Sequence, residues 1–258
     1  NLRLRDAIVR PKELIDYAHK CGLNVIMDIV PNHLGPDIAE LQKTGPYTDG
    51  ENCFGYKFNF EKDSNSIQVR DFIIGAALNW IVNYHCDGLR VDMTKFMCSD
   101  YTMKQMAAEI NFHAPDAFLI AEDGRDNDSR VIQPFPYFEK EENELNHEAY
   151  IAKIRNNNIS LSSLGFDSEW DFPFHKEIAS MILGAWDCRR RNLCSFDYSL
   201  RAAQTRVKYA MSHDEIGNID GTRLISKIVV NELNLCEKMN TCCESEKCKL
   251  MAHASHNI

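Results

Sequence analysis

The sequence predicts an α/β fold built around a parallel sheet. Helix-like segments with apolar residues on one face alternate with short apolar runs along most of the chain. Three such helix–strand repeats follow one another, and repeats of this kind connect parallel strands. Two long polar intervals, 34–67 and 124–164, each follow the end of an expected strand. Loops at that edge of a parallel sheet build active sites, so we expect one domain over 1–258 with long loop insertions at 34–67 and 124–164.

The first repeat lies near the start of the chain. Segment RPKELIDYAHKCG (10–22) places apolar residues at helical spacing and ends on Gly22, a residue suited to a helix C-terminus. The run LNVIMDIV (23–30) follows at once. A continuous apolar run of this length predicts a strand that is buried on both faces.

The later segments alternate in the same way. The other expected helices are IQVRDFIIGAALNWIVNYH (67–85), YTMKQMAAEINFH (101–113) and PFHKEIASMILGAW (173–186). The other expected strands are DGLRVDM (87–93), AFLIAED (117–123), LGFDSEW (164–170) and VKYAMSHDE (207–215), the last two being weaker candidates. Neither an internal repeat nor a low-complexity linker separates them, which favours one domain.

Charge and hydropathy exclude several partner classes. The formal net charge is -9 over 258 residues, which argues against nucleic acid or an anionic membrane as the main partner. No apolar run reaches the roughly 18 to 20 residues that would cross a bilayer. The ten cysteines show no regular spacing, so we expect free thiols and a cytoplasmic protein. The first residue is Asn1, and we expect the sequence to be part of a longer chain.

Polar side chains end nearly every expected strand. They are Asp28, Asn32 and His33, then Arg90 and Asp92, then Glu122 and Asp123, and finally His213, Asp214 and Glu215. The carboxyl ends of parallel strands meet at one rim. These residues should therefore converge on a single acidic pocket with coupled titration.

Paired carboxylates without a nearby nucleophilic serine or cysteine indicate glycosidic bond cleavage. Arg90 lies on the same strand face as Asp92 and should keep that carboxylate ionised, as a nucleophile requires. Glu122 follows the apolar stretch FLIA, where desolvation would raise its pKa toward the range of a general acid. Asp214 would then hold sugar hydroxyls and stabilise positive charge, with hydrogen bonds from His33 and His213.

Each of these residues also has a purely structural explanation. Arg90 with Asp92 is a possible structural ion pair, and Glu122 with Asp123 a possible helix cap. The joint pattern argues against those explanations. Two alternative classes are disfavoured. A nucleotide-binding sheet needs a glycine-rich turn, and a zinc hydrolase needs closely spaced histidines at its strand ends; this sequence contains neither motif.

Four segments together resemble the motifs of the α-amylase superfamily, glycoside hydrolase family 13. They are DIVPNH (28–33), GLRVDMTKF (88–96), IAED (120–123) and SHDEIGN (212–218), in the family's order. The resemblance implies a (β/α)8 TIM barrel. Against that fold the chain supplies strands 3 to 7, while strands 1, 2 and 8 are missing, so we expect an incomplete barrel with poor stability and little activity by itself.

The resemblance also implies roles for individual residues. Asp92 would be the nucleophile, Glu122 the acid/base and Asp214 the transition-state stabiliser. The residues implied to bind substrate around them are His33, Arg90, Lys95 and His213, and Asp28 and Asn32 would give structural support. The family commonly has a histidine after the motif lysine, whereas this chain has Phe96 after Lys95.

Within the superfamily the sequence lies between two subgroups. SHDE, DGLRVD and LGFDSEW resemble 1,4-α-glucan branching enzymes, which we favour, whereas IGN and NDSRV resemble maltooligosyltrehalose trehalohydrolases. The implied substrate is an α-1,4-linked glucan or maltooligosaccharide. No cofactor is expected, although Asn32 resembles a calcium ligand of some α-amylases. A catalytically silent barrel that binds sugar or protein is the rival of a different class.

Overall fold

The computed structural model describes residues 2–35, 41, 45–61, 63–97, 99–125, 131–132, 143–175, 206–209 and 212–213. The chain divides into two compact units, Asn1–Trp170 and Asp171–Ile258. The first unit contains most of the elements and all of the contacts from which the candidate site is built.

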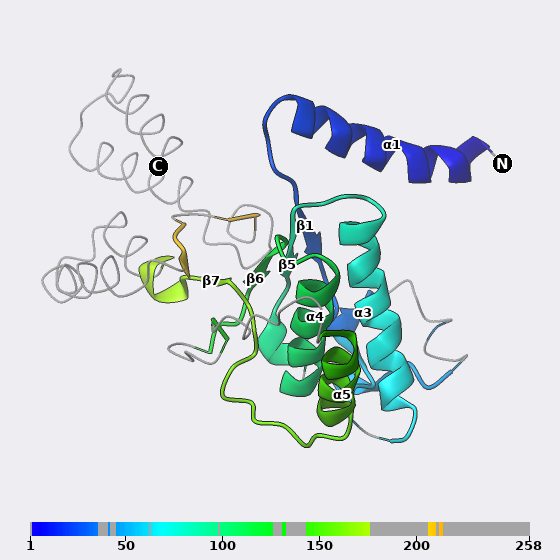
Figure 1. The fold of residues 1–258 in the computed structure, drawn as a ribbon, viewed down its shortest axis with the longest axis vertical. Coiled ribbons are helices and arrows are strands. Elements are labelled where there is room, and N and C mark those ends of the chain that lie inside the picture. The colour runs from blue at the N-terminus through cyan, green and yellow to red at the C-terminus, as the bar shows by residue number, and fades with distance from the viewer. Residues whose placement is uncertain are drawn as a thin grey trace, which may run out of the picture. The chain divides into compact units, whose positions relative to one another are not determined.

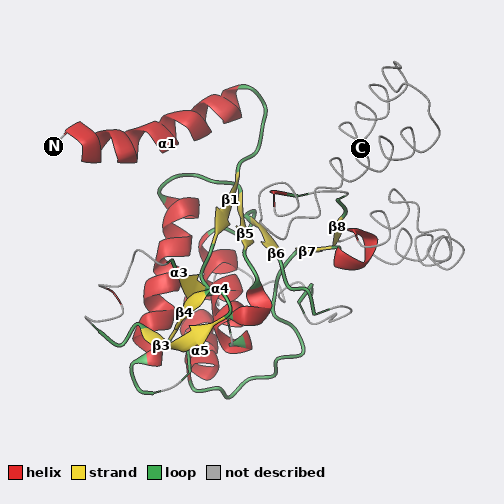
Figure 2. Cartoon of the chain, turned by 180° about the vertical axis from the view of Figure 1, so that it is seen from behind, coloured by secondary structure: helices red, strands yellow, loops and turns green. Residues whose placement is uncertain are grey.

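The first unit is a parallel sheet with helices, as predicted (Figure 1). Strands β1 (Ile26–Ile29), β5 (Gly88–Val91), β6 (Phe118–Ala121) and β7 (Ser168–Trp170) pair in this order, each parallel to the next. The helices are α1 (Leu2–Lys20), α3 (Ser66–Val82), α4 (Asp100–His113) and α5 (Asn143–Arg155). Helix α4 lies between α3 and α5 (Figures 1 and 2). The predicted alternation of helix and strand is confirmed.

Helix α1 ends just before Gly22, as the sequence predicted. Gly22 has a φ of +74°, and its N–H donates to the carbonyl of His19 at 2.9 Å. The N–H of Leu23 reaches back to the carbonyl of Ala18 at 2.9 Å. These two bonds are the Schellman arrangement that closes a helix on a left-handed glycine.

The turn into β5 is fixed by Asp87. Its carboxylate accepts the N–H of Val25 at 2.6 Å and contacts Nε2 of His19 at 2.9 Å. Burial opposes the charge of Asp87, but the Val25 N–H and His19 outweigh burial and lower the pKa of this carboxyl. Asp87 thereby ties the start of β5 to the end of α1 and the approach to β1.

Strand β5 is the most deeply enclosed element of the sheet. All four of its residues are buried, and Leu89 and Val91 have no exposed surface. The apolar side chains of α3 and α4 that build the core beside it include Val69, Ile74, Ala77, Met103, Met106 and Ile110. A polar side chain on β5 must therefore find partners inside the protein.

Strand β1 differs from its prediction. Ile26 and Asp28 are exposed, Ile26 to 39%, and Met27 and Ile29 are only partly buried; Val30 just after the strand is 51% exposed. The expectation of a strand buried on both faces is wrong for this structure. Within the described residues β1 pairs with β5 alone, so one edge and part of its surface have no neighbour.

The intervals expected as long loop insertions contain regular structure. Interval 34–67 holds β3 (Thr48–Asn52) and β4 (Gly55–Phe58), which form a small antiparallel sheet with β2 (His33–Leu34) in the order β2–β4–β3. The Asn52 side chain caps the hairpin by accepting the N–H groups of Phe54 and Gly55. Interval 124–164 contains α5. Short strands with polar residues such as TDGEN give no strong periodic signal, which is why the sequence did not reveal them.

In the second unit the structure describes 171–175, 206–209 and 212–213. Residues 172–175 are helical and β8 covers Arg206–Val207. Asp171 accepts a bond from Lys208 at 2.9 Å, and its N–H donates to the carbonyl of Val207 at 3.0 Å. Most of the expected helix 173–186 lies outside the described residues.

Two chain-wide features concern only the described part. Its helices include none that is both long and apolar enough to cross a membrane. Its cysteines Cys21, Cys53 and Cys86 are free thiols, the first two exposed and the third buried.

Candidate active site

The candidate site is built around Arg90, a buried cation in the middle of β5. Its Nη1 donates to both carboxylate oxygens of Asp28, at 2.8 and 2.7 Å, and to Oδ1 of Asp92 at 2.9 Å. Its Nη2 donates to Oε2 of Glu122 at 2.5 Å. The guanidinium lies over the ring of Trp170, 4.1 Å from the ring centre. One arginine therefore gathers three carboxylates and an aromatic ring.

Strand register explains this convergence. Asp28 on β1 stands directly beside Arg90 on β5, and Arg90 stands beside Ile120 on β6. Asp92 and Glu122 each follow the C-terminal end of their strand. Because the strands are parallel, both ends lie on the same edge of the sheet, as the sequence predicted.

The charge of Arg90 is strongly favoured. Burial opposes a cation at this position, but the hydrogen bonds and charges of Asp28, Glu122 and Asp92 outweigh burial and raise the pKa of Arg90. The arginine stays positive throughout the physiological pH range and neutralises part of the surrounding negative charge.

Asp92 is held from two sides and stays partly open to solvent. Asn32, which is buried, donates its amide N–H to both the carbonyl oxygen and Oδ2 of Asp92 at 2.9 Å. The oxygen of the same amide contacts Nδ1 of His33. The Asp92 side chain is 20% exposed. A carboxylate that is held in place and is partly accessible has the position that a nucleophile needs.

Asn32 uses both ends of its amide within the protein, the nitrogen on Asp92 and the oxygen on His33. The arrangement does not match that of a calcium ligand, which would turn its oxygen toward a cation. The described residues contain no group of three or more acidic, histidine or cysteine side chains suited to a metal ion.

Glu122 is buried, as the sequence indicated, but its surroundings are ionic. Its side chain is 5% exposed and contacts Arg90. It also accepts the N–H of Met93 at 3.2 Å, because Met93 adopts a left-handed conformation with φ +40° and ψ +52°. Both contacts suit a carboxylate more than a carboxylic acid. The apolar setting expected from the FLIA run is therefore not what the side chain meets.

The remaining predicted residues are placed differently. Lys95 is exposed, with its Nζ 5.1 Å from the ring centre of Phe96. Phe96 packs edge-on against Phe54 of the β3–β4 connection, and Phe54 lies 5.6 Å from the His33 ring. His213 is an exposed residue of the second unit.

Asp214 lies outside the described residues. The structure thus brings together six of the nine predicted site residues, namely Asp28, Asn32, His33, Arg90, Asp92 and Glu122. Arg125, for which no role was predicted, pairs with Asp123 and Asp100. The turn sequence EDGRD (122–126) was the available signal.

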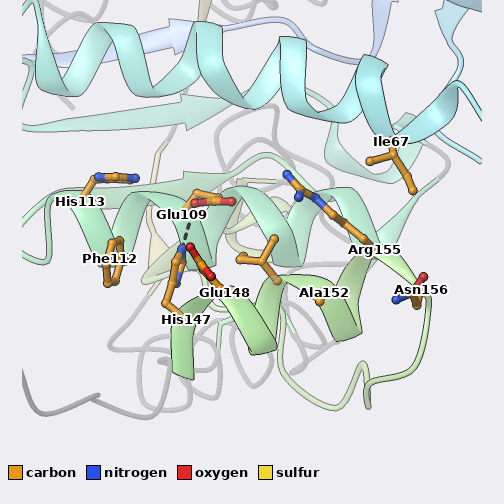
Figure 3. Close-up of a pocket in the computed structure, with 10 residues that line it drawn as sticks. Ile67, Glu109, Phe112, His113, His147, Glu148, Ala152, Arg155 and Asn156 are labelled. Atoms are coloured by element: carbon orange, nitrogen blue, oxygen red, sulfur yellow. Dashed lines mark hydrogen bonds and ion pairs between the residues drawn. The ribbon is translucent and has the colours of Figure 1, made fainter. Parts of the chain in front are cut away.

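A separate cavity of about 760 Å³ lies between α4 and α5 (Figure 3). In it Glu109 faces His147, with 3.0 Å between their polar atoms, and the ring of Phe112 stacks on His147. None of its lining residues belongs to the cluster around Arg90. It is lined by helices and not by strand ends, so it is not the predicted active site.

Solved structures share this fold. A putative α-amylase of Salmonella typhimurium matches 87% of this chain and 40% of its own length, with 22% identity and a TM-score of 0.56. An Anoxybacillus α-amylase matches 86% of this chain and 45% of its own, with 20% identity and a TM-score of 0.52. The chain therefore shares its fold with part of each of these two α-amylases.

Curated proteins add a sequence relationship. Malto-oligosyltrehalose trehalohydrolase of Saccharolobus solfataricus is 30% identical over 233 residues, 86% of this chain and 40% of that protein. The 1,4-alpha-glucan branching enzyme GlgB of Myxococcus xanthus is 27% identical over 225 residues, 78% of this chain and 28% of that protein. No family model matches the sequence. The chain spans about 40% of its trehalohydrolase relative, and its resemblance to the α-amylase superfamily is confirmed.

Proposed function

We propose that this chain is part of a retaining, α-glucan-active enzyme of the α-amylase type. The observation that carries the proposal is the binding of Asp92 and Glu122 to the same guanidinium of Arg90. Retaining glycosidases need two carboxyl groups about 5 Å apart on either side of one anomeric carbon. Two carboxylates that share an arginine are close enough to act on one sugar.

In the proposed reaction Asp92 attacks C1 of a glucosyl unit. The bond between C1 and the leaving oxygen breaks, and Glu122 supplies the proton which that oxygen needs. An acceptor hydroxyl then attacks C1, the ester bond between C1 and Asp92 breaks to release the Asp92 carboxylate, and Glu122, now a carboxylate, takes the proton of the hydroxyl. Asp214 is proposed to stabilise positive charge at the sugar, with His33, Lys95 and His213 binding hydroxyl groups.

The contacts of Glu122 add one requirement to this scheme. Arg90 and the Met93 N–H hold Glu122 in the form needed for the second step. The first step needs its protonated form, so substrate entry must weaken at least one of these two contacts.

The finer architecture is also part of the proposal. We assign the main parallel sheet to an incomplete (β/α)8 barrel over 1–258, containing strands 3 to 7 and lacking strands 1, 2 and 8. Intervals 34–67 and 124–164 are its insertions at the catalytic edge. The exposure of β1 supports this assignment, because every strand of a closed barrel has a neighbour on both sides, whereas within the described residues β1 pairs with β5 alone.

The proposed substrate is an α-1,4-linked glucan or maltooligosaccharide. The relative with 30% identity over 86% of the chain supports hydrolysis next to a trehalose end. Branching, which the sequence motifs favoured, is the second candidate and is supported by the branching-enzyme relative. The two differ in the acceptor, which is water in the first reaction and a glucan 6-hydroxyl in the second.

The natural polypeptide that contains this sequence should be incubated with amylose and, separately, with a maltooligosaccharide ending in trehalose. Released trehalose indicates hydrolysis. Loss of iodine colour with new α-1,6 bonds and few new reducing ends indicates branching. Asp92→Asn should lower either rate by about a thousandfold or more, whereas Asp116→Asn, at an exposed aspartate on the turn before β6, should not. No turnover of any α-glucan would refute the proposal and favour a silent, binding barrel.

A further inference from the structure

The carboxylate next to Glu122 belongs to a chain of contacts that the proposed reaction does not use directly. Asp123 has no exposed surface. Its Oδ2 accepts the hydroxyl of Thr94 at 2.6 Å and Nη2 of Arg125 at 2.7 Å. Its Oδ1 accepts Nε of Arg125 at 2.6 Å. Both oxygens of this buried charge are therefore satisfied, as burial requires.

Arg125 anchors one end of this chain of contacts. Gly124 has a φ of +63°, which turns the backbone so that Arg125 folds back onto Asp123. Nη1 of Arg125 donates to Asp100, the first residue of α4, at 2.8 Å. The bond to Asp123 outweighs burial and raises the pKa of Arg125, so the cation is permanent. Asp123 is thereby fixed relative to helix α4.

Thr94 forms the other end, only two residues after Asp92. It lies in the short 3-10 helix Thr94–Phe96, and its N–H donates to the carbonyl of Glu122 at 2.9 Å. The N–H of Glu122 donates in turn to the carbonyl of Val91 at 3.0 Å. The segment that carries Asp92 and the segment that carries Glu122 are thus joined at this point, beyond the end of the β5–β6 ladder.

We propose that Thr94 and Asp123, anchored by Arg125, are positioning residues that set the place of the Glu122 carboxylate relative to Asp92. This inference rests on the proposed function, since it assigns the two carboxylates their joint task. A buried, charge-assisted network resists deformation better than backbone contacts alone. Catalytic groups need placement within about 0.5 Å, and a shift of about 1 Å costs about a hundredfold in rate.

Thr94→Val is the direct test, because it removes the hydroxyl and keeps the side-chain shape. Asp123 retains Arg125 as its partner, so no buried charge is stranded. Thr102→Val is the matched control. Thr102, in helix α4, is also buried, and its hydroxyl donates to the hydroxyl of Ser99 at 2.9 Å. Thr94→Ser restores the hydroxyl. Arg125→Gln frees Asp123 at the other end.

In the full-length protein we expect Thr94→Val to lower kcat by about tenfold or more with KM changed less than about twofold. Arg125→Gln should lower kcat in the same direction, Thr94→Ser should restore most of it, and Thr102→Val should leave it unchanged. A crystal structure of Thr94→Val should show the Glu122 carboxylate displaced by more than about 0.5 Å. Wild-type kcat in Thr94→Val, or an equal loss in Thr102→Val, would overturn the inference.

The structural readout separates this inference from the proposed function. If the wild-type protein turns over no α-glucan, the proposed function fails. The crystal structure of Thr94→Val still decides the inference in that case, because an unmoved Glu122 side chain would overturn it regardless of activity.

Discussion

Replacement of Arg90 by leucine should be among the most destabilising single changes in the sheet. The Arg90 side chain is 7% exposed, and its partners differ in burial: Glu122 is 5%, Asp92 20% and Asp28 46% exposed. Arg90→Leu leaves Glu122 buried without its cation. Removal of one partner from a buried ion pair costs about 3–5 kcal/mol, whereas an exposed pair contributes about 1 kcal/mol or less.

We therefore predict that Arg90→Leu lowers the free energy of unfolding by about 3–5 kcal/mol, nearly all of it because the Glu122 carboxylate loses its cation. Asp28→Asn, which removes the most exposed partner, should cost less than about 1 kcal/mol. The double variant Arg90→Leu with Glu122→Leu should recover about 2 kcal/mol or more, because no buried charge is then left unpaired. Urea unfolding of the natural full-length protein and the three variants measures these differences.

Two outcomes would refute this reasoning. If Arg90→Leu costs less than about 1 kcal/mol, the buried carboxylate of Glu122 does not depend on Arg90. If Asp28→Asn costs as much as Arg90→Leu, the exposed partner carries the stabilisation and the burial argument is wrong.

Three further predictions concern the surroundings of the sheet. Gly88→Ala should lower the unfolding midpoint in urea, because a Cβ there would stand 2.1 Å from the carbonyl oxygen of Phe118; an unchanged midpoint would contradict the β5–β6 register. Asp87→Asn should cost about 1 kcal/mol at pH 7. Since the pKa of Asp87 is lowered on folding, this stabilisation is present above the unfolded pKa of about 3.9 and is lost as the pH falls through the folded value, so wild type and variant should converge in acid and not in base. Burial raises the pKa of the Cys86 thiol, so peptide mass spectrometry after brief iodoacetamide treatment should find Cys53 modified well before Cys86; equal labelling would show that β5 opens readily.

Much of the site was predictable because charged side chains stand within or directly after apolar strands. Arg90 and Asp92 interrupt an apolar strand at period-two spacing, and Glu122 ends another apolar run. Buried polar groups must be paired, so residues of this kind at parallel strand ends indicated one shared pocket. In the structure Asp92 and Glu122 contact the same guanidinium, that of Arg90.

Other features depend on contacts that no local pattern encodes. The apolar run 23–30 indicated burial on both faces, yet burial of a strand depends on its neighbours, and among the described residues β1 pairs with β5 alone. Arg125 binds Asp100 at the start of α4 as well as the nearby Asp123, and no local pattern indicates that distant partner. The ionic setting of Glu122 depends on the left-handed backbone of Met93 and on Arg90 from another strand.

Trapping of the covalent intermediate tests the central claim most directly. An α-maltosyl fluoride loses fluoride without needing a proton, so the Glu122→Gln variant should form the Asp92 ester and then fail to activate water for its release. Digestion and mass spectrometry should find one maltosyl group on the peptide that contains Asp92. A maltosyl group on a different residue, or no adduct while Asp92→Asn still consumes the fluoride, would contradict the account.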